Sequence, residues 1–192
     1  MNLDAFFDAE FEELTAVAAA TKSATRKSFE ALLSACTASV KTGGKIMLFG
    51  NGGSASDAQH LATELAVRFK TDRAPIAALA LNTDSSALTA IANDFHYDRL
   101  FSRQVEALGK PGDVVIGITT SGNSENVVQG LQMAKDMGIV PAALGGKGGG
   151  KLNGLADPYI IVPSTTTARI QEMHIMLGQM LCGALEQELG LV

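Results

Sequence analysis

The chain has 192 residues, of which 46% are hydrophobic and 18% are charged, and its formal net charge is −5 at pH 7. This length predicts one domain with a sizeable core, and the high apolar content predicts buried subunit surfaces as well. The acidic balance argues against a nucleic-acid partner, because the sequence offers no basic stripe to neutralise phosphates.

The two cysteines and the N-terminal segment argue against several other classes of protein. Cys36 and Cys182 lie far apart and lack the spacing of a metal site, so we expect packing residues rather than a disulfide framework. The first residues are acidic and contain no long apolar run, which predicts neither a signal peptide nor a membrane span. We therefore expect a cytoplasmic protein.

Residues 2–42 predict two helices. The first carries Phe7, Phe11, Leu14 and Ala18 on one stripe, and the second ends at a glycine pair.

Five short apolar runs then predict buried strands, at 45–50, 77–82, 113–119, 140–146 and 158–163. Helical patterns follow the first three of them, at 54–70, 84–108 with a break, and 124–138, and a last helix is expected over 166–189. Strands that alternate with helices indicate an α/β fold, a doubly wound five-stranded parallel sheet flanked by helices. Ligands bind beyond the carboxyl ends of such strands, so the loops after the first and third strands are the expected site.

The turn after the first strand, GNGGSASD at 50–57, is rich in glycine and therefore allows the backbone to approach a ligand closely. Ser54 is predicted to cap the next helix, with Asp57 three residues further on. The turn lacks the last glycine of a dinucleotide-binding fingerprint.

The turn after the third strand places four hydroxyls before a helix, those of Thr119, Thr120, Ser121 and Ser124. Hydroxyls and free N–H groups at a helix N-terminus favour an anion. One such turn is more often an ordinary capped turn, but two of them after parallel strands favour a sugar-phosphate site. A third glycine-rich segment, 145–151, begins like a P-loop but has Leu152 where Ser or Thr must hold magnesium, so we interpret it as a flexible turn.

Two pairs of side chains on predicted helices are candidates for chemistry. His60 and Glu64 are four residues apart on one helix face, a spacing that suits a metal or an acid/base pair, although a surface hydrogen bond is the commoner explanation. Gln171 and Gln179 are eight residues apart and share a face of the last helix. His174, between them, is compatible with a core histidine.

Five motifs in order carry a resemblance to a known family: GNGGSASDAQHLATE, TAIANDF, FSRQVEALG, TTSGNS and RIQEMH. Together they resemble the sedoheptulose 7-phosphate isomerase (phosphoheptose isomerase) family of sugar-isomerase (SIS) domain proteins, over about residues 30–185. The resemblance implies a single flavodoxin-like SIS domain over 1–192, with the helical segment 1–42 on a subunit interface. It also implies a homotetramer, with a dimer as the alternative, and the first step of lipopolysaccharide heptose synthesis.

The resemblance also implies roles for individual residues. Substrate contacts are expected from Asn51, Gly52, Gly53, Ser54, Asn93, Asp94 and Gln171, and phosphate contacts from Thr119, Thr120, Ser121 and Ser124. Zn²⁺ is expected at His60, Glu64 and Gln171, with Glu64 also as the base and His60 beside it in the catalytic group.

Gln179 departs from the pattern, because the family places a histidine there as a metal ligand and acid/base partner of the glutamate. A carboxamide can ligate weakly through its oxygen but cannot shuttle protons near neutral pH. Loss of one general acid/base costs about 10² to 10⁴ in rate. Gln179 therefore predicts a weaker zinc site and lower activity.

Two other functions are compatible with these motifs. The DnaA initiator-associating protein, a non-enzymatic tetrameric relative, is similar in LNTD, LTAIAND and ARIQEMH. A sugar-phosphate sensor that binds without turnover is the third possibility. Glu64 and the two complete turns favour the isomerase, because a scaffold has no need of a base beside a phosphate pocket.

Overall fold

The computed structural model describes all 192 residues and contains one parallel sheet of five strands in the order β2-β1-β3-β4-β5. The strands are β1 (Ile46–Gly50), β2 (Ala78–Ala80), β3 (Val114–Ile118), β4 (Val140–Gly145) and β5 (Tyr159–Ile161). The α-helices are α1 (Leu3–Lys41), α2 (Gly53–Ala66), α3 (Ser85–Phe95), α4 (Leu100–Leu108), α5 (Glu125–Asp136) and α6 (Thr167–Glu188). Short 3-10 turns span Tyr97–Arg99 and Gly150–Leu152. The predicted α/β class and parallel sheet are confirmed.

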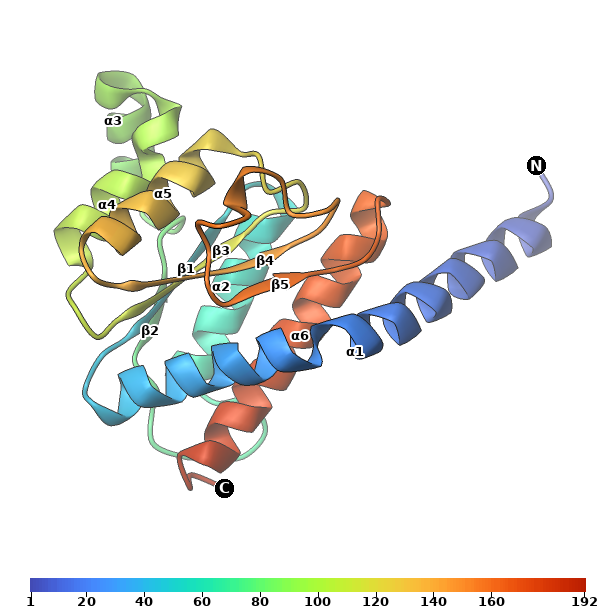
Figure 1. The fold of residues 1–192 in the computed structure, drawn as a ribbon, viewed down its shortest axis with the longest axis horizontal. Helices are drawn as coiled ribbons and strands as arrows, with labels where there is room; N and C mark the ends of the chain where they lie inside the picture. The colour runs from blue at the N-terminus through green and yellow to red at the C-terminus, as the bar shows by residue number, and fades with distance from the viewer.

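Helices cover both faces of the sheet (Figure 1). On one face α1, α2 and α6 enclose the larger apolar core, which includes Leu32, Leu61 and Leu177. On the other face α4 and α5 enclose a second core, in which the rings of Phe49 and Phe101 stack with centroids 4.5 Å apart. Both faces of the strands are buried, which explains their nearly continuous apolar runs.

The prediction of two N-terminal helices is wrong, because residues 3–41 form one continuous helix. The segment between the two predicted helices contains neither proline nor glycine, so nothing in the backbone interrupts the helix. The helix does end before the glycine pair, and Gly43 has φ 79°. Its N-terminal half projects beyond the body of the molecule in Figure 1, and Arg169 of α6 donates to the Glu10 carbonyl at 2.6 Å.

The first and third strands end side by side at one edge of the sheet. They pair in parallel register with Gly50 opposite Ile118, so the turns that follow them start from neighbouring positions. The glycine at position 50 allows this close approach, because a Cβ there would lie 2.7 Å from the Ile118 carbonyl oxygen.

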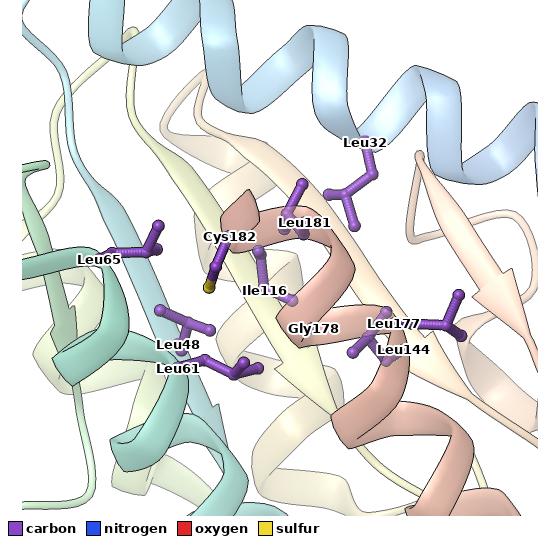
Figure 2. Close-up of a pocket in the computed structure, with 10 residues that line it drawn as sticks. All are labelled: Leu32, Leu48, Leu61, Leu65, Ile116, Leu144, Leu177, Gly178, Leu181 and Cys182. Atoms are coloured by element: carbon purple, nitrogen blue, oxygen red, sulfur yellow. The ribbon is translucent and has the colours of Figure 1, made fainter. Parts of the chain in front are cut away.

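Helices α2 and α6 cross directly on one another. A Cβ at Gly178 of α6 would overlap the Leu61 side chain of α2. Next to this crossing lies an apolar cavity of about 10 Å³, lined by leucines of α1, α2, α6 and the sheet and by Cys182 (Figure 2). A cavity of this size and lining is too small and apolar to bind a ligand. None of the helices combines the length and the apolar character that a membrane-spanning segment requires.

Candidate functional site

The first turn places its glycines at the start of α2. Gly52 precedes the helix with φ 58°, a conformation that favours glycine, and the helix begins at Gly53. The prediction that Ser54 caps the helix is wrong. Ser54 lies within the first helical turn and is buried against Gly50, and no side chain caps α2.

The side chain of Asn51 joins the first turn to the helix of the second turn. Its Nδ2 donates to Asn126 Oδ1 at 2.9 Å, and Asn126 Nδ2 donates back to Asn51 Oδ1 at 2.9 Å. Asn126 lies in the first turn of α5 and is buried. The two turns that the sequence singles out therefore form one continuous site.

The second turn gathers hydroxyls at the N-terminus of α5. The Thr119 and Ser124 hydroxyl oxygens are 3.5 Å apart, and Ser121 Oγ accepts a hydrogen bond from the Asn123 N–H at 3.1 Å. Ser124 is the N-cap residue, yet its hydroxyl accepts no hydrogen bond from the helix. The helix N-terminus thus has donors and a positive dipole end to offer an anion.

A charge pair neutralises the acidic residue at this helix start. Glu125 would repel a phosphate, but Lys151 Nζ lies 2.9 Å from its carboxylate. Hydrogen bonds from Lys151 and then Gln129 hold the pKa of Glu125 below its usual value. The glycine-rich segment that contributes Lys151 leads into a 3-10 turn rather than the α-helix of a P-loop.

His60 and Glu64 form a contact pair on α2. His60 Nε2 lies 3.0 Å from Glu64 Oε1, with the side chains 44% and 23% exposed. Both groups are therefore accessible to a ligand while they hold each other in place. Asp57, one turn earlier, has a raised pKa because it is partly buried, although the charge of His60 opposes this shift.

Helix α6 carries Gln171, which lies at the first turn, and Gln179, which follows the residue at the helix crossing. A Cβ at Gly53 would lie 2.7 Å from Gln171 Nε2, so this carboxamide lies against the start of α2. Gln179 is half-buried and follows Gly178, which packs on Leu61, the neighbour of His60. No hydrogen bond joins Gln179 to His60 or Glu64.

His174 is a core residue, as its position in an apolar helix allows. It is fully buried, and its Nε2–H donates to the Gly145 carbonyl at 3.0 Å. Burial lowers the pKa of His174 to about 4, against a smaller opposite effect of that hydrogen bond. The His174 imidazole is therefore neutral and enclosed. It cannot take the role of the histidine that the family resemblance implies at position 179.

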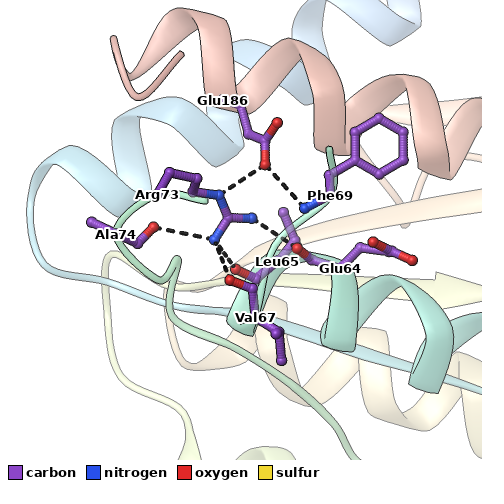
Figure 3. A network of polar contacts seen from close by, with 7 residues as sticks. All are labelled: Glu64, Leu65, Val67, Phe69, Arg73, Ala74 and Glu186. Carbon is purple, nitrogen blue, oxygen red and sulfur yellow. Dashed lines mark hydrogen bonds and ion pairs between the residues drawn. The ribbon is translucent and has the colours of Figure 1, made fainter. Parts of the chain in front are cut away.

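Arg73 fixes α2 against α6 through contacts that the sequence does not reveal (Figure 3). Its Nη2 donates to the Glu64 carbonyl at 2.7 Å, its Nη1 to the Leu65 carbonyl at 2.8 Å, and its Nε to Glu186 Oε1 at 2.8 Å. The side chains of Arg73 and Glu186 are each at most 2% exposed. The guanidinium therefore caps the end of the helix that carries Glu64 and ties it to α6.

The two remaining predicted contacts, Asn93 and Asp94, lie on the exposed helix α3. Asn93 Nδ2 donates to Asp94 Oδ1 at 2.7 Å, and neither side chain forms a hydrogen bond with the two turns. The link comes instead from Tyr97, just beyond α3, whose hydroxyl donates to Asn51 Oδ1 at 2.9 Å. The sequence analysis did not single out Tyr97 or Asn126, although Tyr97 closely follows the motif TAIANDF and Asn126 closely follows TTSGNS.

The donors available to a cation are few. No three histidine, cysteine, aspartate or glutamate side chains gather in a cluster that could hold a metal. The candidate set is one imidazole, one carboxylate and the carboxamides of Gln171 and Gln179. Amide oxygens are acceptable but weak ligands for zinc, so this set fits a cation less tightly than a site with two histidines.

Comparisons with known proteins agree on one family. A family model described as the SIS domain matches residues 11–146. The phosphoheptose isomerase of Paramagnetospirillum magneticum is 56% identical, over 97% of each chain. The structure of the phosphoheptose isomerase of Neisseria gonorrhoeae has a TM-score of 0.91 at 39% identity, covering 97% of this chain and 100% of that one. The structure of a Francisella tularensis phosphoheptose isomerase has a TM-score of 0.93 at 32% identity, with the same coverage.

Proposed function

Because the chain belongs to the phosphoheptose isomerase family of SIS-domain proteins, we propose that it converts sedoheptulose 7-phosphate to D-glycero-D-manno-heptose 7-phosphate. The observation that carries this proposal is the accessible His60–Glu64 pair at 3.0 Å, on the helix that begins at the glycine-rich turn. Ketose-to-aldose isomerisation needs a carboxylate that moves a proton between two neighbouring carbons.

Glu64 is the residue that suits this proton transfer. Its carboxylate takes a proton from C1 of the ketose, which gives an enediolate, and returns a proton to C2, while the hydroxyl proton passes from O1 to O2 to give the aldose. His60 holds one carboxylate oxygen at 3.0 Å, which leaves the other oxygen for the substrate. Arg73 fixes the backbone of Glu64 through its carbonyl, so the base stands on a rigid helix end.

The phosphate binds in the second turn on this proposal. Thr119, Thr120, Ser121 and Ser124 supply hydroxyls, and α5 supplies the positive end of its dipole. Asn51, Gly52 and Gly53 form the neighbouring turn, with the buried Ser54 beneath them. Asn93 and Asp94 are exposed on α3 and are proposed to contact the substrate from that helix.

The proposal includes a zinc ion that the protein binds weakly. His60, Glu64 and Gln171 would hold it, with Gln179 as a weak fourth donor. When bound, Zn²⁺ supplies Lewis-acid stabilisation of the developing oxyanion. Gln179 itself has an N–H that can donate to a substrate oxygen, but it cannot carry a proton.

A homotetramer, with a dimer as the alternative, is part of the same proposal. An open groove runs between α1 and α6 and is lined by apolar side chains that include Phe29, Met173, Met176 and Met180. Phe7 and Phe11 on the projecting half of α1 are 60% and 57% exposed. Apolar surface of this kind supports association between copies of the chain. The similar proteins found in the comparisons are named phosphoheptose isomerases, so they do not favour the function of an initiator-associating scaffold.

Comparison of the unmodified protein with Glu64→Gln tests the proposed reaction. The unmodified protein should form the aldose phosphate from sedoheptulose 7-phosphate. Glu64→Gln should lose turnover while binding the substrate with affinity within about threefold of the unmodified protein. Unchanged turnover in Glu64→Gln would exclude Glu64 as the base. Binding by the unmodified protein without turnover would favour the sugar-phosphate sensor.

A further inference from the structure

The carboxamide of Asn51 makes three hydrogen bonds that leave it only one free group. Its oxygen accepts from Tyr97 Oη–H and from Asn126 Nδ2, both at 2.9 Å. Its nitrogen donates one N–H to Asn126 Oδ1, also at 2.9 Å. A carboxamide has two acceptor positions and two donor hydrogens, so both lone pairs are engaged and a single N–H is left.

The partners of Asn51 differ in how firmly they are held. Asn126 is 2% exposed and lies in the first turn of α5, which fixes it beneath the second turn. Tyr97 is 55% exposed and lies in a 3-10 turn with no buried residue. Asn51 and Asn126 each donate one N–H to the other's oxygen. The same two hydrogen bonds would form if the oxygen and nitrogen of both carboxamides changed places. In the structure the Tyr97 hydroxyl gives its proton to the Asn51 oxygen at 2.9 Å, and this third hydrogen bond adds to the two that Asn51 shares with Asn126.

The position of Tyr97 ties a third segment to the two turns. It follows His96, which has φ 70°, an uncommon value for a residue other than glycine. It precedes α4 and follows α3, the helix that carries Asn93 and Asp94 and has no buried residue. One hydroxyl therefore connects this exposed helix to the first turn and, through Asn51, to the second.

We propose that Tyr97 is a positioning residue, whose hydroxyl holds the Asn51 carboxamide so that its free N–H donates to an oxygen of the bound sugar phosphate. This inference rests on the proposed function, because it assigns Asn51 to the substrate site. Without the hydroxyl, Asn51 loses one of its three hydrogen bonds, so its free N–H is held less firmly toward the ligand and binding weakens.

Tyr97→Phe tests the inference, since it removes one oxygen atom from an exposed ring. We expect KM for sedoheptulose 7-phosphate to rise about 3- to 10-fold, the effect of one hydrogen bond, with kcat within about twofold. The thermal midpoint should not change. Thr89→Val is the matched control: it removes an exposed α3 hydroxyl that donates to the Ser85 carbonyl and forms no hydrogen bond with Asn51, and it should leave KM unchanged.

A double-mutant cycle shows whether Tyr97 acts through Asn51. In an Asn51→Ala background, Tyr97→Phe should have no further effect on kcat/KM. An equal loss in both backgrounds would overturn the inference, and so would an unchanged KM in Tyr97→Phe. The unmodified protein is assayed first: if it fails to turn over the substrate, the proposed function fails, whereas turnover with no effect of Tyr97→Phe removes only the role of Tyr97.

Discussion

The Arg73 guanidinium and the Glu186 carboxylate form an ion pair 2.8 Å apart in which neither side chain is more than 2% exposed. Glu186 Oε1 also accepts the Phe69 N–H at 3.2 Å. The pair joins the end of α2 to α6, so it sets how the helix bearing Glu64 sits against the helix bearing Gln171 and Gln179.

Removal of Arg73 should be strongly destabilising. Arg73→Met leaves Glu186 buried without its partner and uncaps α2, so we expect the free energy of unfolding to fall by about 3–5 kcal/mol. Urea denaturation measures this change in the free energy of unfolding. Lys151→Met, which breaks the exposed pair with Glu125, is the control and should change the free energy by less than about 1 kcal/mol. Equal effects of the two variants would show that burial of the Arg73 pair is irrelevant to stability.

Stability should decline in mild acid because of His174. Its pKa is about 4 in the folded chain, against 6.5 for the ordinary side chain. Between those values the unfolded state binds the extra proton, so stability contributed by neutral His174 is present above pH 6.5 and is lost as the pH falls toward 4. The loss at pH 4 should be up to about 3 kcal/mol.

Urea denaturation from pH 7 to pH 4 measures this loss. A His174→Gln variant should show a flatter profile over the same range. An identical slope in the variant and the unmodified protein would assign the acid sensitivity to other groups.

Ser121→Ala should weaken phosphate binding. The hydroxyl lies in the second turn and accepts only the Asn123 N–H, so its O–H remains for a ligand. We expect the Kd for sedoheptulose 7-phosphate, measured by calorimetry, to rise about 3- to 10-fold. Ser28→Ala, on α1, is the control. If the two variants bind equally well, the phosphate lies elsewhere.

Gln179→His should strengthen the proposed metal site. An imidazole nitrogen is a better zinc ligand than a carboxamide and can also carry a proton, so zinc affinity should increase and turnover should rise by up to about 10²-fold. Zinc affinity is measured by competition with a chromogenic chelator. Gln187→His, at an exposed position two turns further along α6, is the control. No gain over that control would mean that residue 179 does not face the site.

Local patterns predicted the sheet and the two turns well. Each predicted strand contains the observed one, because parallel strands buried on both faces have apolar runs bounded by turn residues. The boundary between two N-terminal helices was wrong, since a polar stretch without proline or glycine does not stop a helix. The Ser54 cap was wrong because Gly52, with its positive φ, starts α2 two residues earlier than the serine pattern indicates.

The contacts that complete the site were beyond local patterns. Asn51 and Asn126 are 75 residues apart, and Arg73 and Glu186 are 113 apart. Such pairs depend on which strands neighbour each other and on how helices cross, and neither is encoded in the spacing of nearby residues. The resemblance to the isomerase family supplied Asn51 but not the groups that hold it.

Turnover of sedoheptulose 7-phosphate by the purified, unmodified protein, after chelation of metals and again after addition of zinc, tests the proposed activity most directly. We predict formation of the aldose phosphate, with a higher rate in zinc and saturation only at high zinc concentration because of Gln179. The absence of turnover in both conditions, with the fold intact, would contradict the isomerase assignment.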